Sequence, residues 1–215
     1  MRDFTSAEII FALMWAARWT VLLSIVAFAC GGAAGVMVTL IRISPVKPVR
    51  FLGRVYVEVI QGIPLLIQFL LVFFGLRVLG IRLSPWMAAT LALTTFTSAF
   101  LADIWRGSIQ AIPKEQWDAS SALSFNYFQQ LGLIILPQAI RTSIPPTVGF
   151  LVQVIKGTSL ASAIGFVELA RSASNITNVT FDPFFVYLST AMIYFFICFP
   201  ISILSRRLEK KLTYE

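Results

Sequence analysis

Few residues of this 215-residue chain are suited to catalysis, and they form no known catalytic arrangement. The sequence contains no histidine, which excludes Ser-His-Asp and Cys-His arrangements and disfavours a zinc site. The run Lys156-Gly157-Thr158-Ser159 lacks the upstream glycine spacing and the preceding strand that a phosphate-binding loop needs. No spacing singles out a Ser-Lys dyad. We therefore expect no enzyme, and no metal or cofactor bound by this chain.

Polar residues inside apolar segments are the remaining candidates for function. Glu58 and Gln61 interrupt one such segment, and Gln153 and Thr158 interrupt another. A charged group at mid-bilayer costs about 2.5 kcal/mol or more and usually faces protein or water, so these residues are candidates for a substrate pathway. Two structural alternatives remain open. Glu58 can pair with Arg54, one helical turn earlier, and the polar residues of the later segment can hydrogen-bond between helices.

An uncharged stripe runs along the later segment. Phe150, Val154, Gly157 and Ala161 follow one another at spacings of four, three and four, which places them on one helical face. We predict that this stripe lines any substrate site in the membrane. The alternative is that it only packs against another helix, with Gly157 permitting close approach.

The composition places these residues in a membrane protein. Hydrophobic residues make up 58% of the chain and charged residues only 13%. A hydrocarbon core of about 30 Å needs roughly 20 helical residues per span. Five apolar segments are long enough, and none shows the alternation of a β-barrel. The sequence therefore predicts an all-α fold with five transmembrane helices, at residues 19–41, 51–76, 84–105, 139–164 and 184–204.

The net charge of +7 is distributed as a topology signal and not as a nucleic-acid-binding face. One basic cluster follows the first span and another follows the last; Arg77 and Arg82 lie on the opposite side and run against this bias. Because basic residues favour the cytoplasm, the pattern predicts an outside N-terminus and a cytoplasmic C-terminus. The two clusters comprise Arg42, Lys47, Arg50, Arg54, Arg206, Arg207, Lys210 and Lys211.

Residues 114–137 form a cytoplasmic loop with helix signals of its own. Pro113 suits the first turn of a short helix over 114–123, and Ser124 and Asn126 suit a turn or cap before a second helix. We expect Pro137 to end that second helix. A helix-turn-helix is more than a connection requires, so we interpret the loop as a docking surface.

This loop resembles the E-A-A-x3-G-x9-I-x-L-P loop in permease subunits of bacterial ABC importers. Asp118-Ala119-Ser120, Ser124 and Ile134-Ile135-Leu136-Pro137 have its spacing. Asp118 replaces the glutamate, Ser120 the second alanine and Ser124 the turn glycine. Each substitute is either small or of the same charge.

Further motifs resemble the polar amino acid subfamily of these permeases, of the histidine, glutamine, arginine and glutamate type. Residues 56–68 are similar to Y-x-E-x-x-R-G-T-P-L-L-x-Q, with Gln61 replacing the arginine and Ile63 the threonine. Residues 103–114 resemble E-x-x-R-G-x-x-Q-S-I-P-K, residues 136–141 resemble L-P-Q-A-x-R, and residues 156–160 resemble K-[DN]-T-S-L, with Gly157 at the variable position. The resemblance covers nearly all the chain.

The resemblance implies a single permease domain over residues 1–215, with the type I ABC importer fold, in the bacterial inner membrane. It implies as partners two ATPases that bind ATP and Mg, a second permease subunit, identical or homologous, an extracytoplasmic solute-binding protein and membrane lipid. The substrate would be a polar amino acid or a similar small zwitterion. We expect a neutral or acidic amino acid, or a compact zwitterion, rather than a basic one, since the stripe offers a cation no counter-charge. The rival interpretations are a membrane scaffold subunit without a substrate pathway and a passive channel. The ATPase-coupling residues would be Trp117, Asp118, Ala119, Ser120, Ala122, Leu123 and Ser124.

Overall fold

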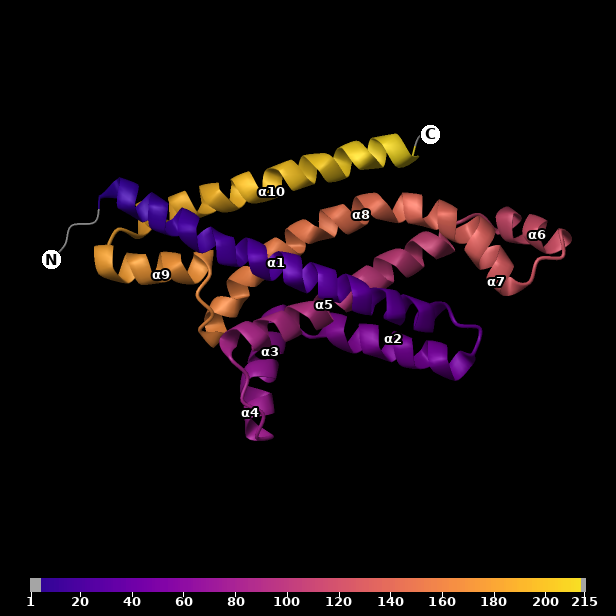
Figure 1. Cartoon of the computed structure of the whole chain (residues 1–215), viewed down its shortest axis with the longest axis horizontal. Coiled ribbons are helices and arrows are strands. Elements are labelled where there is room, and N and C mark those ends of the chain that lie inside the picture. Colours follow the sequence, from indigo (N-terminus) through magenta and orange to yellow (C-terminus); the bar gives the residue numbers. More distant parts are fainter. Residues whose placement is uncertain (1–4, 214–215) are drawn as a thin grey trace.

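The computed structural model describes residues 5–213, which form helices and no strand. The helices lie along one long axis, with α6 and α7 projecting at one end and α9 at the other (Figure 1). By length and composition, four of the helices described could each cross a membrane, and a bent pair raises the number to five. The prediction of an all-α, five-span chain agrees with this arrangement.

The first span is longer than predicted. Helix α1 covers Ser6–Ile43, a run of 38 residues that begins before the expected start at residue 19. Thr5 and Glu8 form a capping box at its start, which explains why the helix begins there. Its small residues pack on α5 (Pro85–Gln110): a Cβ at Gly31 would lie 2.5 Å from Thr97 Cβ, so glycine is required at this crossing.

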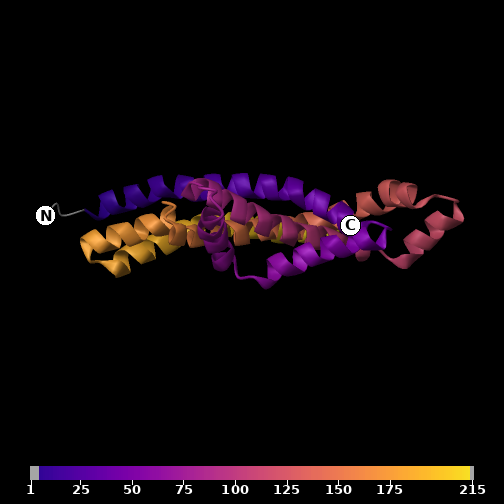
Figure 2. The same ribbon diagram turned by 90° about the horizontal axis from the view of Figure 1, so that it is seen from below.

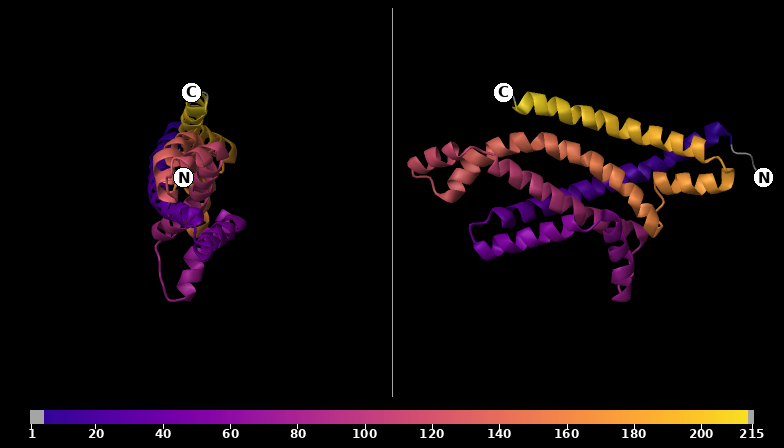
Figure 3. Two further views of the ribbon diagram at one scale, coloured as in Figure 1. Left: turned by 90° about the vertical axis from the view of Figure 1, so that its right-hand side faces the viewer. Right: turned by 180° about the vertical axis from the view of Figure 1, so that it is seen from behind.

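The second span is not the continuous helix that the sequence predicts over 51–76. It divides into α2 (Lys47–Gly62) and a second arm of α3 (Leu65–Leu70), the π-helical η1 (Leu71–Gly75) and α4 (Leu76–Val78), bent by 101°. Pro64 causes the break, because it has no N–H to donate to Ile60. Gln68 Nε2 instead donates to the carbonyls of Ile60 and Ile63, at 2.7 and 2.8 Å. Figure 3 shows the second arm leaving the bundle.

The prediction that Pro137 ends a helix is wrong. After α6 (Lys114–Ala122), α7 (Tyr127–Gln129) continues through the π-helical η2 (Gln130–Ile135) into α8 (Leu136–Gly157). The wider π turn lies just before Pro137, and Gln138 Nε2 donates to the carbonyl of Ile134 at 2.8 Å. The π turn accommodates the proline without a break. The helix of the fourth span therefore runs without interruption from α7 through η2 and α8, and it ends in the 3-10 helix η3 (Thr158–Ile164).

Two helices complete the chain. The short amphipathic α9 (Leu169–Thr180) packs beside the starts of α1 and α10 (Pro183–Thr213), and apolar side chains of all three form a small core. The view in Figure 2 shows α6 and α7 beyond one end of the bundle and α9 at the opposite end. The larger core lies between α1, α3, α5, α8 and η3.

Candidate coupling surface and substrate pathway

Helix α6 ends in a well-defined turn. Ser124 N donates to Ser121 O at 2.9 Å and Phe125 N to Ser120 O at 3.3 Å, the hydrogen-bond pattern of a Schellman motif. This motif needs a left-handed residue, and Ser124 adopts it with φ of +62°. The turn thus has the conformation that glycine favours, although the residue is serine. Asn126 then caps α7 by a capping box with Gln129.

The predicted coupling residues divide into two groups. Asp118, Ala119, Ala122, Leu123 and Ser124 are exposed, and Leu123 retains 67% of its accessible surface. Ser120 is 1% exposed and donates to Trp117 O at 2.8 Å, so its side chain faces this chain and is unavailable for contact with a partner. Trp117 is half-buried.

Trp117 instead connects α6 to the bundle. Its ring stacks on Tyr127, with 6.2 Å between ring centroids, and Tyr127 Oη donates to Ile43 O at 2.7 Å. Tyr127 therefore joins the loop to the last residue of α1.

The stripe on α8 and η3 packs inside this chain. Phe150, Val154 and Ala161 belong to the largest buried cluster. A Cβ at Gly157 would lie 3.0 Å from Leu65 Cδ2 and 3.5 Å from Leu93 Cδ1. This geometry favours the packing alternative, because the stripe meets α3 and α5.

The polar pathway candidates have different surroundings. Glu58, Gln61 and Gln153 are exposed, whereas Thr158 is fully buried and donates to Ile155 O at 2.7 Å. The predicted pairing of Glu58 with Arg54 is absent from the salt bridges of residues 5–213. The exposed candidates Glu58 and Gln61 lie on α2, and Gln153 lies on α8. Among the described residues, no salt bridge joins Glu58 to the α8 candidates.

A charged cluster that sequence analysis did not identify joins α1 to α5. Asp103 Oδ1 lies 2.7 Å from Arg42 Nη1 and 2.9 Å from Arg106 Nη2. The Arg42 side chain is only 9% exposed, and Arg106 also contacts Gln110. The motif over residues 103–114 contained two of these residues, but Arg42 was interpreted only as a topology signal.

A buried carboxylate, also missed, holds the α9 end together. Glu168 caps α9 by accepting from Ala170 N at 2.9 Å and Arg171 N at 2.8 Å. Its Oε2 also accepts from Tyr194 Oη at 3.0 Å and from Thr20 Oγ1 at 3.3 Å. Burial raises the pKa of the Glu168 carboxyl, and these four hydrogen bonds oppose that shift.

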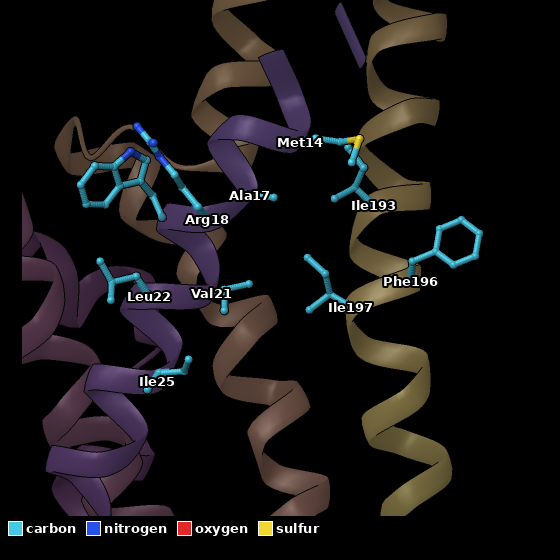
Figure 4. Close-up of a pocket in the computed structure, with 10 residues that line it drawn as sticks. Met14, Ala17, Arg18, Val21, Leu22, Ile25, Ile193, Phe196 and Ile197 are labelled. Atoms are coloured by element: carbon cyan, nitrogen blue, oxygen red, sulfur yellow. The ribbon is translucent and has the colours of Figure 1, made fainter. Parts of the chain in front are cut away.

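A groove between α1 and α10 is poorly suited to a polar solute. It measures about 1050 Å³ and lies between α1 and α10, where Ala17 and Val21 face Ile193 and Ile197 (Figure 4). Arg18 points away from α10, and its guanidinium lies 3.6 Å from the Trp15 ring centroid. The remaining lining is apolar, which suits lipid or another helix.

Comparisons with known proteins agree with this architecture. The sequence model of the family described as "Binding-protein-dependent transport system inner membrane component" matches residues 27–214. The probable glutamine ABC transporter permease protein GlnM of Bacillus subtilis is 38% identical over 193 residues, covering 90% of this chain and 89% of that protein. The L-cystine transport system permease protein TcyB of the same organism is 36% identical over 195 residues, covering 90% and 83%.

Solved structures give the same result. A chain of the crystal structure of an amino acid ABC transporter with histidines superposes with a TM-score of 0.89 at 32% identity, covering 94% of both chains. The MetNI methionine ABC transporter in an inward-facing conformation gives a TM-score of 0.71 at 16% identity, covering 95% of both chains, which shows a shared fold.

Proposed function

The chain belongs to the family of inner membrane components of binding-protein-dependent transport systems, and on that premise we propose that it carries a neutral or acidic polar amino acid across the bacterial inner membrane. It is a permease subunit of an ATP-driven ABC importer and not itself an ATPase. In general terms, an ATPase and a solute-binding protein are its partners. We propose that ATP and Mg are bound by two copies of the ATPase, and that a second permease subunit completes the pathway.

The exposed face of α6 is the observation that carries the coupling proposal. Asp118, Ala119, Ala122 and Leu123 are exposed at the end of the bundle, on a helix fixed by Trp117 and by the turn at Ser124. Small side chains at Ala119 and Ala122 permit a partner to approach closely, and Asp118 can pair with a basic residue. We assign this face, including Ser124, to the ATPase, while Trp117 and Ser120 support it from within.

Replacing Ala119 tests this assignment. We expect Ala119→Arg to abolish ATPase binding and uptake, because a long charged side chain prevents close contact, while insertion into the membrane is unchanged. The measurement is uptake of labelled amino acids by proteoliposomes that contain the whole importer, together with ATPase co-purification. Ala111→Arg is the matched control, since Ala111 is exposed but lies outside α6. Normal uptake by Ala119→Arg would refute the docking assignment.

For the substrate pathway, we propose the exposed polar residues Glu58, Gln61 and Gln153. Two relatives named for glutamine and L-cystine support the proposed specificity, and so does the glycine at position 157, where the related motif carries Asp or Asn. Lys156 is exposed three residues after Gln153 and so shares its side of α8, where it can face a substrate carboxylate. The stripe of Phe150, Val154, Gly157 and Ala161 is assigned to holding α8 and η3 against α3 and α5, from where it positions Gln153 and Lys156. Thr158 is buried and bonded within its own helix, so we assign it to packing as well.

Competition for uptake tests the specificity. Glutamine and glutamate should compete better than arginine and lysine in the reconstituted importer, and preferred uptake of arginine or lysine would refute the proposal.

Gly157→Leu tests the packing role of the stripe. This variant should impair uptake, because the leucine side chain would meet Leu65. Unchanged transport by Gly157→Leu would show that Gly157 is needed neither for the substrate pathway nor for packing against α3 and α5.

For the orientation, we propose an extracytoplasmic N-terminus and a cytoplasmic α6 and C-terminus. The basic clusters after α1 and at the end of α10 support this topology. A cysteine at position 118, with Cys30 and Cys198 replaced, should be labelled only after permeabilisation of cells. Labelling of intact cells by a membrane-impermeant reagent would reverse the topology.

A further inference from the structure

A basic cavity lies beside α6, on the side that faces the bundle. It measures about 420 Å³ and forms where the ends of α1 and α5 meet the starts of α2 and α6. Arg42, Arg50 and Lys114 line it, together with the amide of Gln110. Three cationic side chains from three helices thus converge on one space.

The positive charge of this cavity is only partly balanced. Arg42 is paired with Asp103 at 2.7 Å. Arg50 and Lys114 have no carboxylate within salt-bridge distance among residues 5–213, and both are exposed. Within residues 5–213, the hydrogen bond found for the Arg50 guanidinium is a long one, to the carbonyl of Ser44 at 3.5 Å. Two charges therefore remain available to an anion.

The rest of the lining is apolar. Ile109 and Ile112 are buried beneath the basic side chains, and Ile43, Trp117 and Tyr127 complete the wall. An inorganic anion would use only the basic part of this surface. A ligand with an anionic head and an apolar body would use both parts.

The position of the cavity in the fold favours a lipid over other ligands of this kind. Arg42, Arg50 and Lys114 stand where the chain leaves its apolar segments, the level at which basic residues meet lipid headgroups. Lys114 and Trp117, three residues apart, share the face of α6 that lines the cavity. Ala119 and Leu123, which are assigned to the ATPase, lie on another face. Asp118, four residues after Lys114, lies at the border, so the cavity adjoins the coupling surface without including its small residues.

We propose that this cavity binds an anionic phospholipid of the cytoplasmic leaflet, whose phosphate oxygens accept hydrogen bonds from Arg50 and Lys114. The bound phosphate joins the start of α2 to the start of α6, so the lipid fixes the coupling helix against the broken span. The assignment to the cytoplasmic leaflet rests on the orientation proposed above, whereas the lipid site itself does not.

Retention of lipid by the full-length chain tests the site. The chain is placed in nanodiscs of phosphatidylcholine with a minor fraction of phosphatidylglycerol, then released and measured for bound lipid by native mass spectrometry. The double variant Arg50→Gln/Lys114→Gln should bind phosphatidylglycerol about tenfold or more weakly, because each basic residue near an anionic lipid contributes on the order of 1 kcal/mol. Lys210→Gln/Lys211→Gln removes two exposed charges elsewhere and should retain the lipid.

Three results would contradict the proposal. Equal retention by the two double variants would overturn the site. Displacement of phosphatidylglycerol by inorganic phosphate at similar concentration would show a simple anion site and overturn the lipid assignment, and so would loss of the lipid on assembly with the ATPase. Since a nanodisc offers the same lipid to both faces and no transport is measured, failure here leaves the proposed transport function intact.

Discussion

The two ends of the bundle are held by different kinds of polar contact. At the α9 end, Glu168 is completely buried and accepts four hydrogen bonds from three elements. At the α6 end, Asp103 is partly exposed and pairs with two arginines, and most residues of α6 are themselves exposed. The comparison shows one end that satisfies its polar groups internally and another that leaves charge and surface for partners. We expect the first end to be stiff and the second to move when a partner does.

The largest predicted effect is on the α9 end. Glu168→Leu leaves the donors of Ala170, Arg171, Tyr194 and Thr20 without their acceptor, so it should destabilise the chain by about 3 kcal/mol or more. Thermal denaturation of the detergent-purified chain should show a Tm lower by about 6 °C or more. Glu58→Leu, at an exposed site without an ion pair in the described chain, is the control and should change Tm little. Equal shifts in the two variants would remove the contrast between the ends.

The pH dependence sharpens the same contrast. Burial raises the pKa of Glu168 above its ordinary value of 4.5, so the folded chain binds this proton more tightly than the unfolded chain. Its contribution is therefore fully present below pH 4.5 and is lost as the pH rises through the raised pKa. Wild-type Tm should fall over that range relative to the Tm of Glu168→Gln, which does not titrate. A constant difference between the two proteins would contradict the predicted shift.

A smaller effect is expected at the α6 end. Asp103→Asn removes the charge that holds Arg42 and Arg106, but solvent reaches this cluster, so the loss should be about 1–2 kcal/mol. Added salt should reduce the effect of Asp103→Asn and leave that of Glu168→Leu unchanged, because salt screens exposed charges. Glu209→Gln, an exposed carboxylate, serves as control. If the stability loss of Asp103→Asn does not depend on salt, the Asp103 cluster is shielded from solvent like the Glu168 cluster, and the contrast between the two ends is wrong.

The smallest effect should be at the turn after α6. Ser124 has a left-handed backbone, which costs a non-glycine residue about 1 kcal/mol, so Ser124→Gly should raise stability by roughly that amount. Ser124→Val should lower it, since a β-branched residue fits this conformation poorly. Measured unfolding free energies in the opposite order would contradict the geometry of the turn.

Sequence reasoning succeeded where the signal was local. The sequence predicts a short helix over 114–123, and α6 covers Lys114–Ala122, with Pro113 at its N-cap and not in its first turn. The effects of the prolines could not be predicted locally. Pro64 breaks its span and Pro137 does not, because the turn before Pro137 widens into a π-helix, which no local sequence signal indicates.

By itself, the sequence determined that this protein is all-helical, crosses a membrane several times and carries a helix outside it, since apolar length, charge and capping residues act over one or two turns. Only the tertiary structure decided which polar residues meet. Arg42 and Asp103 are separated by 61 residues, and Thr20 and Glu168 by 148. Neither pair has a local pattern, because such contacts form only when distant helices pack and exclude water. The same packing decided that the stripe at Phe150 and Val154 faces inward and leaves Gln153 and Lys156 exposed.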